Sequence, residues 1–197
     1  GDQTITGKLS NGTGLVSTAV HAAGGSLTMG DLEINNAGTI TFGSGNTTGV
    51  SQYAITGALT GSGTLSKNGA GTLLLKPSSA TGYSGIVQVS AGSIRVTDTA
   101  VLGTSSATNA IDLNGGIFEL RTDSTTFASS KRVNLNNGGT LDMIVDRAPG
   151  GTGLNQTVTF ANFDYDAGEG LTFTSRNGYN VTFSAATAIG GATGGTT

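Results

Sequence analysis

A glycine-led pattern that returns at nearly even intervals is the feature that most limits how this chain can fold. The unit reads glycine, a small or apolar residue, an apolar residue, any residue and a second apolar residue. It begins at Gly38, Gly71, Gly92, Gly116 and Gly139, and the last four starts are almost evenly spaced. Units with a period of roughly 23 residues are typical of solenoids, because one unit cannot bury its apolar face without neighbours stacked on it.

The segments inside the repeat alternate between apolar and polar residues with a period of two. Segments 39–42, 93–96, 140–143 and 180–183 are rich in Thr, Val, Ile and Phe, which suit a half-buried pleated surface. Gly and Asn cluster between these segments, where they favour turns. No sustained run has apolar residues at the i, i+3, i+4 and i+7 positions of a helix, so the sequence predicts an all-β chain.

Parallel coiling is the arrangement that reconciles these features. Parallel strands usually need helical crossovers, and no helices are expected here. A β-helix makes each crossover from turns and further strands, and its coils stack about 4.8 Å apart. We therefore predict a right-handed parallel β-helix, a β-solenoid, with the hand taken from the general rule for parallel crossovers. An antiparallel β-sandwich is the alternative fold.

The predicted β-helix forms a single domain over residues 1–189, with its clearest repeat over 59–103 and a Gly/Thr-rich linker or cut end at 190–197. Aligning the glycine-led units predicts two inward-facing stacks of side chains. The third position of the unit gives Ile40, Leu73, Ile94, Phe118 and Leu141. The fifth position gives Phe42, Leu75, Val96, Leu120 and Met143.

Three segments in the middle of the chain carry a more specific pattern. Residues 63–75 read GTLSKNGAGTLLL, residues 82–85 read GYSG, and residues 87–96 read VQVSAGSIRV. These segments resemble the autotransporter passenger-associated strand repeat, although the loop at 77–79 is longer than is usual for it and no second clear copy follows. The resemblance implies a β-helical, extracellular passenger segment of the kind often involved in adhesion, aggregation or surface display.

Composition narrows the function classes. The chain has 9 Lys and Arg, 12 Asp and Glu, a net charge of −3 and no Cys. We expect no nucleic-acid partner, because the few basic residues are scattered, and neither disulfides nor a thiolate metal site. No run of 18 apolar residues is present, so no membrane-spanning segment is expected. No residue is predicted to be catalytic or to bind a metal, and no cofactor is expected.

We therefore expect a structural or adhesive segment of a secreted or cell-surface bacterial protein, not an enzyme. Its expected partners are a host-cell, matrix or glycan surface, or further copies of itself through the ends or faces of the β-helix. Two alternatives stay open. One is a β-helical carbohydrate-active enzyme, either a polysaccharide lyase or a hydrolase, and the other is the subunit of a self-assembling surface fibre.

One column of charged residues stands out in the aligned repeats. The fourth position holds Arg95, Glu119 and Asp142, which are expected to point outward on successive coils, with Arg121 beside them. Such a column is typical of a surface ion-pair ladder, and these four residues are also the candidate surface-binding patch. Segment 162–169, with Asp164 and Asp166, has acidic spacing like that of a calcium loop but lacks the full twelve-residue pattern, so calcium binding there stays open.

Overall fold

The chain folds into stacked coils of parallel strands. The computed structural model describes residues 1–12, 15–19, 25–43, 52–78, 82–97, 110–124, 127–129, 132–135, 140–160, 163–166, 170–184 and 188–190. All pairings between the described strands are parallel, and the described residues contain no helix. The predicted all-β solenoid is therefore confirmed, and the alternative of an antiparallel sandwich is wrong.

Two long sheets run the length of the stack. Sheet 1 has eight strands, which are, in spatial order, β1 (Gln3–Ile5), β4 (Ser26–Met29), β7 (Gln52–Ile55), β10 (Thr72–Leu75), β12 (Ser93–Val96), β14 (Gly116–Arg121), β17 (Thr140–Asp146) and β20 (Gly170–Ser175). Sheet 2 also has eight, namely β3 (Val16–Ala19), β6 (Thr39–Phe42), β9 (Thr64–Lys67), β11 (Val87–Val89), β13 (Ala110–Leu113), β16 (Arg132–Leu135), β19 (Phe163–Asp166) and β22 (Ala188–Gly190).

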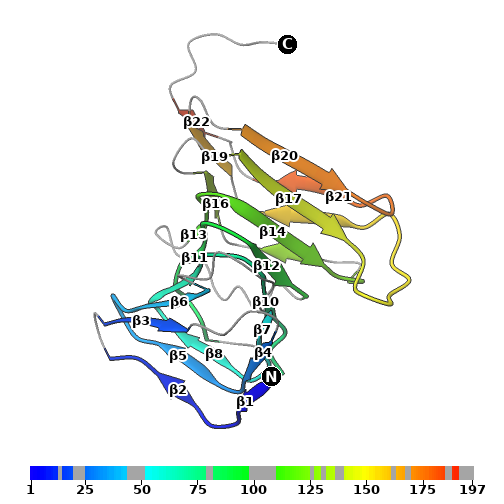
Figure 1. Cartoon of the computed structure of the whole chain (residues 1–197). Coiled ribbons are helices and arrows are strands. Elements are labelled where there is room, and N and C mark those ends of the chain that lie inside the picture. The colour runs from blue at the N-terminus through cyan, green and yellow to red at the C-terminus, as the bar shows by residue number, and fades with distance from the viewer. Residues whose placement is uncertain are drawn as a thin grey trace.

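Two short sheets add a third side at each end of the stack. Sheet 3, near the N-terminus, contains β2 (Leu9–Ser10), β5 (Leu32–Ile34) and β8 (Leu59–Gly61). Sheet 4, near the C-terminus, contains β15 (Phe127–Ser129), β18 (Thr157–Phe160) and β21 (Asn180–Phe183). In these parts of the chain, consecutive strands pass from sheet 1 to the short sheet and then to sheet 2. Figure 1 shows sheet 1 climbing from β1, beside the N-terminus, to β20 at the other end.

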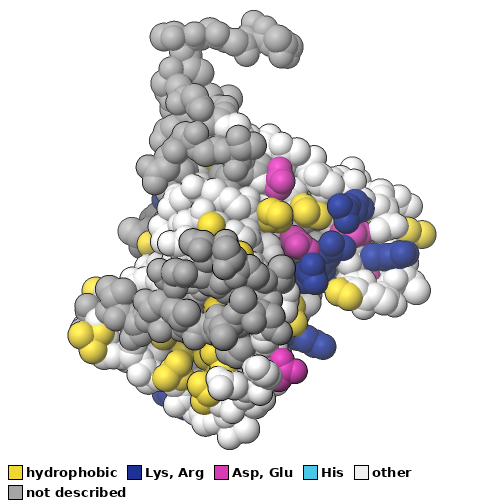
Figure 2. Space-filling model, viewed as in Figure 1, with side chains coloured by type: hydrophobic (Ala, Val, Ile, Leu, Met, Phe, Trp, Pro, Cys, Tyr) yellow, Lys and Arg dark blue, Asp and Glu magenta, His cyan; other side chains and the backbone are white. Residues whose placement is uncertain are grey.

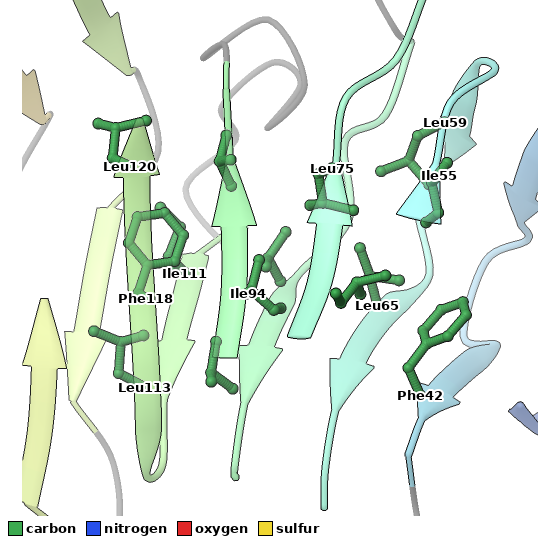
Figure 3. Close-up of a cluster of buried hydrophobic side chains, with 14 of the residues drawn as sticks. Phe42, Ile55, Leu59, Leu65, Leu75, Ile94, Ile111, Leu113, Phe118 and Leu120 are labelled. Carbon is green, nitrogen blue, oxygen red and sulfur yellow. The ribbon is translucent and has the colours of Figure 1, made fainter. Parts of the chain in front are cut away.

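The core is one column of apolar side chains enclosed by the sheets. Strand β10 shows how the sequence produces it, because Leu73 and Leu75 are fully buried and Leu74 between them is half-exposed. Figure 3 shows buried side chains from neighbouring coils, including Ile94 and Phe118, following one another along the stack. Burying each such side chain contributes roughly 1.5–3 kcal/mol, which makes the stacked alternation the main stabilising feature of the fold.

The two predicted stacks are correct in the middle of sheet 1. Leu73 pairs with Ile94, and Ile94 pairs with Phe118 on the next coil. The second stack is equally regular and comprises Leu75, Val96 and Leu120. The glycine-led alignment therefore gives the right register over three coils.

The predicted register is wrong by two residues on strand β17. Phe118 pairs with Met143, whereas Leu141 lies opposite Gly116. Leu120 correspondingly pairs with Val145. A shift by two residues keeps the same side chains on the inner face, since strand side chains alternate with a period of two, so the apolar pattern accommodates either register.

The first repeat unit belongs to a different sheet from the others. Strand β6 carries Ile40 and Phe42 into sheet 2, where they pair with Leu65 and Lys67 of β9. Ile40 and Phe42 are both buried, so their inward orientation is confirmed while their place in the sheet 1 stacks is wrong. A glycine followed by alternating apolar residues suits either side of a coil, because both sides share one core.

A tyrosine closes the third side of the coil between β10 and β11. Tyr83 is fully buried and forms a single parallel bridge with Gly61, the last residue of sheet 3. Its hydroxyl hydrogen is shared between Gly63 O at 2.8 Å and Ile86 O at 2.5 Å, and its oxygen accepts from Leu65 N at 3.1 Å. Tyr83 thus satisfies backbone groups that a strand would otherwise pair.

A lysine occupies the core position above Phe42 in sheet 2. Lys67 is fully buried, and its Nζ donates to Gly69 O at 2.6 Å and to Ala70 O at 3.2 Å. Burial lowers the pKa of Lys67 from its ordinary value of 10.5 to about 8. A neutral amine still has two N–H groups, so it can make both hydrogen bonds without a buried charge.

Because of Lys67, the free energy of unfolding should vary with pH in the alkaline range. Between about pH 8 and 10 the unfolded chain holds a proton on Lys67 that the folded chain releases, so the free energy of unfolding should rise with pH by up to about 3 kcal/mol. Above about pH 10 the trend should reverse. Burial raises the pKa of Tyr83, so Tyr83 ionises in the unfolded chain before it does in the folded chain, and the free energy of unfolding should then fall as pH rises. Urea unfolding of the chain and of Lys67→Met across this range checks this. A rise of equal slope in both proteins would contradict the assignment.

Candidate functional site

Three of the four residues in the predicted charged column lie together on the outer face of sheet 1. Arg95 on β12 pairs directly with Glu119 on β14, and Arg121 is the last residue of β14. Arg95 Nε lies 2.9 Å and Arg121 Nε 3.2 Å from Glu119 Oε2. Glu119 is buried between them, with a relative exposure of 7%. The two arginines therefore pair with the same oxygen of Glu119 from neighbouring positions on the sheet.

Asp142 does not join this column, and Asp146 takes the place predicted for it. The shifted register of β17 puts Ile144 opposite Glu119 and places Asp142 beside Ile117. Asp146 lies opposite Arg121 instead, and Arg121 Nη1 donates to Asp146 Oδ2 at 2.6 Å. Asp146 is not predicted from the repeat, because the glycines alone do not fix the register of β17. The alternating apolar residues from 141 to 145 indicate the longer strand that reaches Asp146.

The Asp146 carboxylate accepts three hydrogen bonds from its own chain. Its Oδ1 accepts from the backbone N of Arg147 at 2.8 Å and from Asn177 Nδ2, while Oδ2 accepts from Arg121. Burial alone would raise the pKa of Asp146. The hydrogen bonds from Asn177 and Arg147, with the positive charges of Arg121 and Arg176, hold that pKa below its ordinary value of 3.8. Asp146 is therefore a fixed negative charge and a poor proton donor at neutral pH.

The loop after β17 forms one wall beside these charges. Gly151 N donates to Ala148 O at 2.8 Å, which closes a turn with Pro149 and Gly150 at its centre. Gly150 has φ +76°, the left-handed value that the third residue of a type II turn requires. Asp123 fastens the loop from the previous coil, since its carboxylate accepts from Ala148 N at 3.0 Å and from Thr152 N at 2.9 Å.

Together the strands and the loop enclose a surface pocket of about 330 Å³, which we call the arginine pocket. Its lining residues are Arg95, Arg121, Asp146, Arg147, Ala148, Pro149, Gly150 and Asn177. Three of these are arginines and one is a carboxylate whose oxygens are already bonded. Figure 2 shows Lys and Arg side chains gathered beside Asp and Glu side chains on this part of the surface. The pocket thus offers net positive charge on a chain whose total is −3.

Known proteins supply no further guide to what this pocket does. No family model, curated protein or solved structure matches the chain.

The other candidate site from the sequence is the acidic segment 162–169, which the structure describes only in part. Asp164 and Asp166 lie in strand β19, where Asp164 pairs with Asn134 and Ala188. Their side chains and residues 167–169 fall outside the described part of the chain. Among the described residues, no three His, Cys, Asp or Glu side chains are grouped so as to hold a metal ion. The same residues include no helix that could cross a membrane.

Proposed function

We propose that this chain is a structural and adhesive segment of a bacterial cell-surface protein, similar to an autotransporter passenger, that holds a binding face away from the cell. The observation that carries the proposal is the continuous stacking of sheets 1 and 2, each of eight parallel strands around one core. Unbroken backbone pairing of this kind makes a stiff support. The resemblance of residues 63–96 to the passenger-associated repeat supplies the extracellular setting.

Adhesion of coated beads tests this proposal. Beads carrying the folded chain are washed over host-cell layers, matrix proteins and polysaccharide films, beside beads carrying albumin. We expect the chain to hold beads on at least one surface and a heat-unfolded sample to lose that ability. Retention no greater than that of albumin on every surface would contradict the adhesive part of the proposal.

The residues of the arginine pocket give little support to the alternative function, a β-helical carbohydrate-active enzyme. A β-helical lyase or hydrolase needs groups that exchange protons with substrate. Asp146 has a lowered pKa, and Glu119 is buried between two arginines, so both carboxylates are engaged in ion pairs with arginine. We expect no cleavage of polysaccharides with or without calcium, and sustained turnover in that assay would overturn the adhesive proposal.

End-to-end association is a second candidate function, and the two ends of the stack favour it. Ile5 and Leu9 on the first coil are 40% and 37% exposed, and Phe173 on β20 is 45% exposed. Phe173 also borders an apolar pocket of about 250 Å³ with Val181 and Phe183. Edge strands with exposed apolar residues are templates for further pairing. Sedimentation across a concentration series tests this, and a single monomer boundary at all concentrations would exclude it.

A further inference from the structure

The arginines of this chain form a row along the outer edge of sheet 1. Four successive strands of the sheet each contribute one, in β12 (Arg95), at the end of β14 (Arg121), and directly after β17 (Arg147) and β20 (Arg176). The chain has only five arginines in all, so four of them are gathered in this one row. Neighbouring strands lie about 4.8 Å apart, and the register places Glu119 opposite Arg95 and Asp146 opposite Arg121, so acids lie between the arginines of this row.

The acids beside the row leave much of this charge free. Arg95 and Arg121 each use Nε on Glu119, and Arg121 also uses Nη1 on Asp146. Within the described part of the chain, Arg147 and Arg176 form no ion pair through their side chains. Both are exposed. Glu119 and Asp146 therefore orient the inner arginines, while the outer guanidinium groups keep N–H donors for a ligand.

Guanidinium N–H donors favour a ligand that carries anionic oxygen atoms. An arginine fork matches the planar oxygens of a carboxylate or the oxygens of a sulfate, and charge-assisted hydrogen bonds of this kind are about twice as strong as neutral ones. The turn at Pro149 and Gly150 is held by Asp123 and gives the pocket a fixed wall. The pocket volume of about 330 Å³ lies at the lower end of the range for small-molecule sites.

We propose that the arginine pocket and its row bind an acidic polysaccharide through carboxylate or sulfate groups carried on successive sugars. A single anion can occupy only one stretch of the row, whereas a linear polyanion can meet several arginines at once. Nucleic acid is the other common linear polyanion. The lining of the pocket includes no aromatic side chain on which bases could stack, which favours the polysaccharide. The inference rests on the proposed function for its extracellular setting.

Binding of defined polymers to matched variants tests this inference. Polygalacturonate and chondroitin sulfate are titrated onto the immobilised chain, with dextran, free galacturonate, inorganic sulfate and a single-stranded oligonucleotide as comparison probes. The variants are Arg147→Gln and Arg95→Gln. The control is Lys8→Gln, which removes the same charge from the first coil, where the described ion pair of Lys8 is a surface contact with Glu33 at 3.0 Å.

We expect binding of at least one acidic polymer that weakens with added salt, since exposed charges are screened. Each arginine variant should lose about tenfold in affinity, the usual effect of removing one charge-assisted contact. Lys8→Gln should stay within about twofold of the unmodified chain. Thermal denaturation of each variant confirms that it is folded, and Arg147→Gln is the safer variant because its side chain makes no described ion pair.

Several results would overturn the inference. They are no binding of either acidic polymer, dextran binding as tight as polygalacturonate, or arginine variants that behave like Lys8→Gln. Free galacturonate or sulfate binding as tightly as the polymers would show a single-anion site, and tighter oligonucleotide binding would show a nucleic-acid surface. Retention of beads on cells without any polymer binding would remove this inference while leaving the proposed function in place.

Discussion

Replacing Leu73 with Asp should lower the free energy of unfolding by at least about 4 kcal/mol and the melting temperature by roughly 10 °C. Leu73 is fully buried in sheet 1, between Tyr53 on one coil and Ile94 on the next. The variant removes a packed side chain and puts an unpaired carboxylate in its place, and a buried charge without a partner is among the most costly changes a core can receive. Thermal denaturation followed by far-ultraviolet circular dichroism measures the loss.

The adjacent residue provides the matched control. Leu74 points outward, is half-exposed and pairs with Arg95 across the strands. Leu74→Asp introduces the same charge beside an arginine and in contact with water, so its effect should stay within about 1 kcal/mol. Equal losses in Leu73→Asp and Leu74→Asp would mean that the alternation of β10 does not define the core.

Replacing Gly85 with Ala should cost about 3 kcal/mol, although it adds only one methyl group. A Cβ at this position would overlap the carbonyl oxygen of Gly63 on the preceding coil and lie 2.7 Å from Tyr83 Oη. The carbonyl belongs to backbone and cannot rotate away. The coils would have to separate locally, which would break the hydrogen bonds of Tyr83 to Gly63 and Ile86. Chemical denaturation of the variant measures the cost.

Gly82→Ala is the comparison that isolates the close approach. Gly82 lies slightly earlier in the same segment, and a Cβ there would meet no atom of the described residues within 4 Å. The alanine should be neutral or stabilise the fold by up to about 1 kcal/mol, because it restricts the unfolded chain. If both variants lost the same stability, general loop entropy and not the contact with the preceding coil would explain the effect.

The parallel coiling and the middle of the core could be predicted from the sequence because both depend on local signals. Glycine-led turns and two-residue alternation are visible in short windows, and they place Leu73, Ile94 and Phe118 in one stack, as observed. The resemblance of this region to a passenger repeat concerns the same residues. Its implications for adhesion and export remain predictions.

The register of β17 and the sheet of β6 could not be predicted, because neither is fixed by local pattern. Leu141, Met143 and Val145 offer apolar side chains at three alternating positions, so a shift of two residues changes which coil neighbours meet without changing the face. Ile40 and Phe42 fit the inner face of either long sheet for the same reason. Only the stacking of whole coils decides between these possibilities.

The candidate site, too, could be predicted from the sequence only in part. Arg95, Glu119 and Arg121 were predicted as neighbours because they lie where the glycine alignment holds. Asp146 and Arg147 were missed because they lie where it fails. The role of Asp123 depends on a contact between two successive coils, in which its carboxylate accepts a hydrogen bond from Ala148 N. No sequence pattern within either segment predicts such a contact.

The pairing of each strand only with the coil before and the coil after it has a mechanical consequence. Every partner in sheet 1 is one coil away along the chain, from Gln52 with Thr72 in the shorter coils to Thr140 with Gly170 in the longest. Cooperativity in such a molecule passes from one coil, or rung, to the next. Among the described strands, none of the first rung pairs with one of the last. Tension or heat should therefore fray the molecule inward from its termini, and a chain of this design can gain or lose whole rungs while its middle keeps the same environment.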